Sequence, residues 1–260
     1  MEVIHGRHNA FTKDVISNMP DIVITSILDR LPLQDAVRTG VLSRIWRFKW
    51  TMLSKLVFDK NFFAYLSKTQ GKNNHVTVIG RILLHLRCAI AKFVLSVEDT
   101  TSDAEHINHW ILFLSRKGIK DLTLKNTDET PLKFPTHLLL FRITSSSSIF
   151  ELVASLPKLQ ELDLDFLCSK DPLRTPAICF PERDYNTMRL WQLQSVVFTD
   201  LKASENEVCL IKYLLACSPI LKKVVIRSGY SLISSNVKLT FARKLLKLHR
   251  TSPVVEIDLY

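Results

Sequence analysis

One hydrophobic pattern recurs through most of the chain: an apolar residue, two others, an apolar residue, one other, and an apolar residue. It occurs eight times, as LSKLVF, IAKFVL, IKDLTL, LLLFRI, LQELDL, LQSVVF, LKKVVI and VVEIDL. The alternation at the end of each segment predicts a short β-strand that buries one face, and the first apolar residue lies in the preceding turn. A strand of this length cannot bury its face alone, so neighbouring strands are expected to stack in parallel.

The segments between the strands carry a helical pattern. Residues 75–87, 103–116, 205–217 and 238–250 are each predicted to form an amphipathic helix. Strand starts lie 19 to 37 residues apart, and most of these distances fall within the range of repeat proteins. Alternating strands and helices predict a parallel sheet with right-handed crossovers, and hence a curved α/β solenoid with its strands on the concave side.

The segment from Met19 to Trp50 has a different pattern, typical of three short helices. Pro20 suits a first helical position, and Pro32 ends the first helix. Ser43 is a candidate cap for the third helix. The first helix places Val23, Ile24, Ile27, Leu28 and Leu31 on one face. A unit of about 35 residues is marginal alone, so it needs the rest of the chain or another protein to cover its apolar side chains.

The order of residues from Ile16 to Trp50 resembles the F-box of plant F-box proteins. The likeness rests on Leu31-Pro32, the DAVRT run at 35–39, and Leu42-Ser43 followed by Trp46 and Trp50. Met19 stands where the family usually has leucine, and Ile22 where it often has an acidic residue. The resemblance implies docking on a Skp-type adaptor and, through it, on the cullin of a ubiquitin ligase.

Two further stretches extend the resemblance over nearly the whole chain. GIKDLTLKN at 118–126 is similar to degenerate plant leucine-rich repeats, and the region from Leu193 to the last residues is similar to the FBD region. The chain is thus identified as an F-box/FBD/LRR-repeat protein of the α/β class, with a small three-helix F-box before a curved leucine-rich-repeat solenoid. The expected regions are a flexible N-terminus at 1–13, the F-box at 14–52, degenerate repeats at 53–190 and an FBD-like region at 191–260.

The resemblance implies a substrate-receptor subunit without catalytic activity, whose F-box binds the adaptor and whose solenoid binds a protein substrate. The residues implied in adaptor docking are Met19, Pro20, Val23, Ile24, Ile27, Leu28, Leu31 and Trp46. Sequence alone does not separate those that form the core of the small unit from those that touch the adaptor. Four basic residues, Arg38, Arg44, Arg47 and Lys49, either meet an acidic adaptor or form a solvated face.

Composition leaves one alternative open. A net charge of +10 suits a basic nucleic-acid-binding protein or another non-enzymatic interaction protein. Basic and acidic residues are expected to be interspersed, however, and no nucleic-acid-binding motif occurs. Five cysteines without a C-x-x-C pair argue against a disulfide framework or a zinc module and favour buried free thiols. With no signal peptide or membrane-length apolar run, an intracellular protein in the nucleus or cytoplasm is expected.

No constellation of catalytic residues is present, and no cofactor is expected. His106 and His109 have a spacing that allows two metal ligands on one helix face, but no third ligand is near in sequence. Asp163 and Asp165 are expected on the same strand face, opposite Leu162 and Leu164, where they can contact a substrate. Residues 136–148 make the repeat array unusually tight, either as a compact repeat or because a segment is missing.

Overall fold

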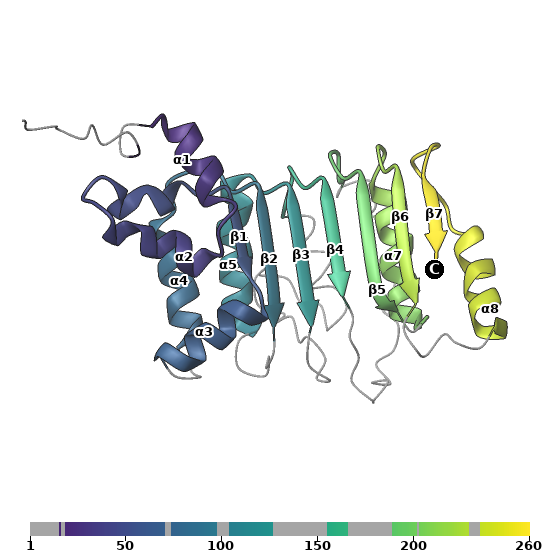
Figure 1. Ribbon diagram of the computed structural model, residues 1–260. Helices are drawn as coiled ribbons and strands as arrows, with labels where there is room; N and C mark the ends of the chain where they lie inside the picture. Colours follow the sequence, from purple (N-terminus) through teal and green to yellow (C-terminus); the bar gives the residue numbers. More distant parts are fainter. Residues whose placement is uncertain are drawn as a thin grey trace, which may run out of the picture.

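A computed structural model describes residues 16, 19–70, 74–97, 104–126, 155–165, 189–201, 203–228 and 235–260. Its centre is a seven-stranded sheet in which the strands follow their order in the sequence, and every neighbouring pair is parallel. The strands are β1 Lys55–Phe58, β2 Lys92–Val97, β3 Asp121–Asn126, β4 Glu161–Asp165, β5 Ser195–Leu201, β6 Lys223–Ser228 and β7 Glu256–Leu259. Figure 1 shows the sheet in front of its helices, with the N-terminal helices at the β1 end. The α/β solenoid with parallel strands is thereby confirmed.

The predicted apolar positions form continuous rows across the sheet. Register aligns Leu56, Phe93, Leu122, Leu162, Val196 and Val224 in one row, and Phe58, Leu95, Leu124, Leu164, Phe198 and Ile226 in the next. All of these side chains are buried. Six of the eight predicted segments therefore bury every apolar position of the pattern, including the one before the strand. The segment LLLFRI lies outside the described residues.

The segment VVEIDL differs from the other six. Val254 is 64% exposed, and Ile257 and Leu259 are only partly buried. Among the described strands, β7 pairs with β6 alone. A strand with one neighbour gains less burial from the sheet than a strand with two. The other end strand, β1, also has one strand neighbour, but helical segments pack against it and bury its apolar side chains.

Each strand from β1 to β5 is joined to the next by the same backbone arrangement. One carbonyl oxygen just before a strand accepts hydrogen bonds from two successive N–H groups that precede or begin the following strand, at 2.7–3.1 Å. The accepting residues are Ser54, Ala91, Lys120, Gln160 and Gln194. Because the arrangement recurs five times, these five places in the chain are structurally equivalent. The repeat read from the sequence is thus a repeat of backbone bonding as well.

Four helices of the solenoid were expected, and all four are found. They are α4 His75–His85, α5 Ala104–Lys117, α7 Glu205–Cys217 and α8 Ser235–Leu246. A capping box begins α7: the Ser204 hydroxyl accepts the N–H of Glu207, while the Glu207 carboxylate accepts the N–H of Ser204. One further helix, α3 Lys60–Gln70, was missed. Its signal was Asp59, whose carboxylate accepts the N–H of Phe62 at 2.9 Å as a helix cap does.

The N-terminal unit contains α1 Asp21–Leu28, α2 Leu33–Arg38 and two 3-10 helices, η1 Thr39–Val41 and η2 Trp46–Met52. The Ser43 hydroxyl accepts the N–H of Trp46 at 3.3 Å, as its predicted capping role requires. The third helix is therefore found, but as a 3-10 helix. The two 3-10 helices approach each other closely: a Cβ on Gly40 in η1 would lie 3.1 Å from the carbonyl oxygen of Arg47 in η2.

One expectation about cysteine is wrong. Cys88 and Cys217 are in no disulfide bond, whereas Cys209 is disulfide-bonded. An odd number of cysteines excludes the pairing of all of them but does not exclude a single bond. Burial raises the pKa of the Cys217 thiol to about 11, which makes this thiol a poor nucleophile at neutral pH.

Asp29 joins the N-terminal unit to the sheet. It follows α1, and its carboxylate accepts the Ser54 hydroxyl at 2.6 Å and the N–H groups of Ser54 and Lys55 at 3.1 and 3.3 Å. Ser54 also supplies the first of the recurring carbonyl acceptors. The start of the sheet is thus positioned by a side chain of the helical unit.

We expect Asp29→Ala to lower the free energy of unfolding by about 1–3 kcal/mol, because it removes the acceptor of the part-buried Ser54 N–H and hydroxyl and of the exposed Lys55 N–H. Urea unfolding followed by circular dichroism measures the change. The exposed neighbour Arg30 provides the control, and Arg30→Ala should stay within about 0.5 kcal/mol of the parent chain. Equal effects of the two substitutions would show that Asp29 does not hold the unit to the sheet.

Candidate protein-interaction surfaces

Exposed apolar side chains gather on the N-terminal unit. Within the described residues, ten of the nineteen exposed large hydrophobic side chains lie between Ile16 and Phe48. A concentration of this kind marks a surface that binds another molecule more often than one that faces only water. The middle of the solenoid has few: Leu84, Leu112 and Trp191.

The structure divides the eight residues predicted for adaptor docking into two groups. Ile24, Leu28 and Trp46 are 1%, 0% and 4% exposed and belong to the core. Met19 is partly buried against that core. The outward group is Pro20, Val23, Ile27 and Leu31.

Val23 and Ile27 are 40% and 41% exposed and lie one turn apart on α1. They therefore point away from the small core that Ile24 and Leu28 build. Sequence reasoning missed other outward apolar residues of the same unit: Ile22, Val37, Val41, Leu42, Ile45 and Phe48. The sequence does show that this unit has more apolar residues than about 35 residues can bury, but it does not show which of them are left outside. We call the exposed apolar residues of 20–48 the N-terminal apolar surface.

The basic residues of this unit have unequal surroundings. Lys49 forms an ion pair with Asp21 at the start of α1. Arg38 lies 3.8 Å from the Asp35 carboxylate, and its guanidinium stacks over the Tyr65 ring at 5.0 Å. Arg44 and Arg47 are exposed. These last two are therefore better placed than Arg38 or Lys49 to meet an acidic partner.

The second candidate surface is the face of the sheet that the helices leave open. Register places one row of polar side chains across it, Lys55, Lys92, Asp121, Glu161, Ser195, Lys223 and Glu256. The next row is mostly apolar: Val57, Val94, Thr123, Asp163, Val197, Val225 and Asp258. Asp163 and Asp165 do lie on this face, opposite the buried Leu162 and Leu164.

Asp163 stands out on the open sheet face. Its strand neighbours in the row are Thr123 and Val197. Burial raises the pKa of its carboxyl, and the nearby charges of Lys125, Arg227 and Lys92 oppose that rise only in part. Burial therefore disfavours the charged form of Asp163 more than its basic neighbours favour it.

We expect Asp163→Asn to stabilise the fold at neutral pH. A carboxyl with a raised folded pKa favours the native state below the unfolded pKa and loses that contribution as pH rises through the folded pKa. The gain from the substitution should therefore be present at pH 7 and vanish near pH 3. Urea unfolding at the two pH values, with Glu161→Gln on the same strand as control, measures it. If Asp163→Asn instead lowers the stability at pH 7, the pKa of Asp163 is not raised in the folded protein.

Other candidate chemistry is not assembled. His106 and His109 are exposed on α5, and no group of three or more possible metal ligands occurs within the described residues. Nor does any helix in that part of the chain have the length and apolar character to cross a membrane.

Comparison with known proteins assigns the N-terminal unit. Residues 16–58 match the model of the F-box domain. An F-box/FBD/LRR-repeat protein of Arabidopsis thaliana is 30% identical over 206 residues, which are 77% of this chain and 41% of that protein. The chain is an F-box protein of the F-box/FBD/LRR-repeat family.

Other relatives agree with the assignment. An Arabidopsis F-box protein is 30% identical over 259 residues, or 96% of this chain and 48% of the relative. Another Arabidopsis F-box/FBD/LRR-repeat protein is 42% identical over 113 residues, or 43% of this chain and 27% of the relative. The F-box protein described here spans less than half the length of these three relatives.

The matched range gives the F-box of this protein a structural meaning. It runs to Phe58, the last residue of β1, and so includes the first strand of the sheet as well as the helices. The bonds from Asp29 to Ser54 and Lys55 lie inside that range. In this F-box protein, the F-box is therefore built into the end of the solenoid.

Proposed function

We propose that this chain is the substrate-receptor subunit of a Skp–cullin–F-box ubiquitin ligase. The F-box would bind a Skp-type adaptor, the adaptor would bind the cullin, and the solenoid would hold a protein substrate. The subunit would act without catalysing transfer, by raising the effective concentration of substrate near the conjugating enzyme. Such a role would place the protein in the nucleus or cytoplasm.

The observation that carries the proposal is the division of apolar residues within the F-box. Ile24, Leu28 and Trp46 already fill its core. Val23, Ile27 and their exposed neighbours are left outside it and favour a groove on a partner, as in recognition of helices by apolar grooves. The exposed Arg44 and Arg47 would add attraction to an acidic adaptor.

The open sheet face supports the second half of the proposal. It lies on one side of the solenoid, while the helices cover the other (Figure 1). Its rows combine charged side chains of both signs with valines. A protein substrate can use both kinds of contact.

Reconstitution tests the proposed assembly. The purified chain, a plant Skp-type adaptor and the N-terminal part of a cullin are mixed in pairs and together, then separated by size-exclusion chromatography. We expect the chain to elute with the adaptor, and with the cullin only when the adaptor is present. A folded chain that fails to elute with the adaptor, or that binds the cullin without it, would refute the proposal.

A further inference from the structure

The positive charge of the protein is concentrated near its C-terminal end. From Val208 to Val255 the sequence contains nine lysine or arginine residues and no acidic residue. The other 212 residues hold 26 basic and 25 acidic residues, so they are nearly neutral. The expectation that basic and acidic residues are interspersed is therefore wrong for this region.

Helix α8 presents part of this charge to solvent. Phe241 and Leu245 face the core and are 2% and 3% exposed. Arg243, Lys244 and Lys247 are exposed. Helical spacing places Arg243 on the side of α8 away from Phe241 and Leu245, and Lys244 toward one margin. Lys247 is the first residue after α8, in the turn that continues it, where its N–H bonds to the Lys244 carbonyl oxygen at 3.2 Å.

Apolar side chains border this basic stripe on both sides. Leu239 and Leu246, at 51% and 73% exposure, lie along one margin of α8. Val237, at 44%, lies along the other. We call the basic stripe with its two apolar margins the α8 surface.

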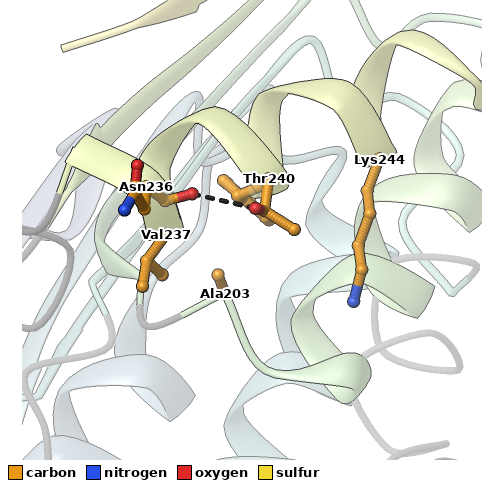
Figure 2. A pocket seen from close by; sticks show the side chains of 6 residues that line it. Ala203, Asn236, Val237, Thr240 and Lys244 are labelled. Atoms are coloured by element: carbon orange, nitrogen blue, oxygen red, sulfur yellow. Dashed lines mark hydrogen bonds between the residues drawn. The ribbon is translucent and has the colours of Figure 1, made fainter.

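A hollow of about 260 Å³ opens along the Val237 margin. Ala203, which precedes α7, lines one wall. The other wall comes from one side of α8: Asn236, Val237, Thr240, Phe241 and Lys244. Figure 2 shows Val237, Thr240 and Lys244 along α8 with Ala203 facing them.

The hollow combines an apolar wall with one cation. The Thr240 hydroxyl donates to the Asn236 carbonyl oxygen at 2.8 Å, so its polar atom is bound within the helix. Lys244 is the charged residue among those that line the hollow. An apolar side chain fits this space if a carboxylate lies close enough to reach the Lys244 ammonium.

The residues of the α8 surface select among possible occupants. An apolar surface of another protein packed on α8 would bury three cations, and burying a cation without an anionic partner costs free energy. A nucleic acid would use the cations, but not Leu239, Leu246 or the hollow, and the aromatic residue of α8, Phe241, is buried and not available for base stacking. A helix lying on a membrane needs one continuous apolar face, and that face of α8 is already packed in the protein.

We propose that the α8 surface binds an acidic segment of a partner protein that also carries apolar side chains. Its carboxylates contact Arg243, Lys244 and Lys247, and one apolar side chain enters the hollow beside Val237. That the partner is a ubiquitylation substrate rests on the proposed function. The binding itself requires no adaptor.

Fluorescence anisotropy with the whole chain tests the site. The probe is a fluorescein-labelled peptide of about 12 residues made of Glu, Asp, Leu and Phe, and a second peptide replaces Leu and Phe by Ser. We expect the first to bind at physiological salt and the second at least about fivefold more weakly, because it loses the apolar contacts. Equal affinities would overturn the proposal, since the apolar margins and the hollow would then have no part.

Two sets of charge reversals locate the binding. Arg243→Glu, Lys244→Glu and Lys247→Glu together should weaken binding of the first peptide more than about tenfold. The matched set Lys60→Glu, Arg116→Glu and Lys120→Glu changes the net charge equally on exposed sites elsewhere, and should change the affinity by about twofold or less. Equal losses in the two sets would mean that net charge alone attracts the peptide, and would overturn the site.

A milder variant guards against misfolding, and competitors distinguish other ligands. Lys244→Gln with Lys247→Gln introduces no new charge and should still weaken binding of the peptide severalfold.

A single-stranded oligonucleotide or vesicles containing phosphatidylserine should not displace the peptide at equal charge concentration. Displacement by either would overturn the choice of an acidic protein. If the folded chain binds the peptide but does not bind the adaptor, the proposed function is refuted and the α8 site is not.

Discussion

Replacing Phe93 by alanine is expected to lower the free energy of unfolding by about 3–5 kcal/mol. Phe93 is fully buried in the row that crosses the sheet, and its ring lies 5.6 Å from that of Phe58 on the neighbouring strand. The substitution loses the free energy gained by transferring a large ring out of water, and it loses the packing contacts of that ring. It also leaves a cavity between Leu56 and Leu122. Urea unfolding followed by circular dichroism gives the change directly.

Val94 provides the control for Phe93. It is the next residue on β2, it points to the open sheet face, and it is only partly buried. Val94→Ala should cost about 1 kcal/mol or less, because little packing is lost on that face. Similar costs for the two substitutions would mean that the inward and outward faces of the sheet are wrongly assigned.

The second large effect is expected on binding. Val23→Asp with Ile27→Asp should weaken the affinity for a Skp-type adaptor by at least about a hundredfold, because both carboxylates would have to lose water in an apolar contact. The core residues Ile24 and Leu28 are untouched, so the helices should keep their circular dichroism spectrum. Isothermal titration calorimetry with purified adaptor measures the affinity.

The matched control for this pair lies on the solenoid. Leu84 and Leu112 are also exposed, at 77% and 38%, on α4 and α5. Leu84→Asp with Leu112→Asp introduces the same two charges and should leave the affinity for the adaptor unchanged. A hundredfold loss in this pair, or none in the first, would remove the N-terminal apolar surface from the interface.

The sheet could be predicted from sequence because its signal is local and repeats. In a strand, alternate side chains face opposite sides, so the residues around Phe93 or Leu162 are assigned to a face once the strand is recognised. Partial exposure of β7 could not be predicted in the same way. Its sequence pattern equals that of the others. The difference is tertiary, because β7 has one strand neighbour, whereas the other end strand, β1, is also contacted by α2 and α3.

The division of the F-box residues needed the structure. Ile24 and Ile27 are the same residue type on one helix, and periodicity places both on an apolar face. Which of them is buried depends on where Leu33, Ala36 and Trp46 pack, and that is a property of the tertiary arrangement. The α8 surface was missed for another reason. The net charge of the whole chain does not show that the region around α8 has basic residues and no acidic residue, while the acidic residues lie elsewhere in the sequence.

Hydrogen–deuterium exchange of the chain with and without a plant Skp-type adaptor tests the central claim most directly. Adaptor docking on the N-terminal apolar surface predicts slower amide exchange in peptides that cover 20–31 and 41–48, with β2 and α8 unchanged. Slowed exchange confined to the sheet or α8, or no change anywhere at saturating adaptor, would contradict the account.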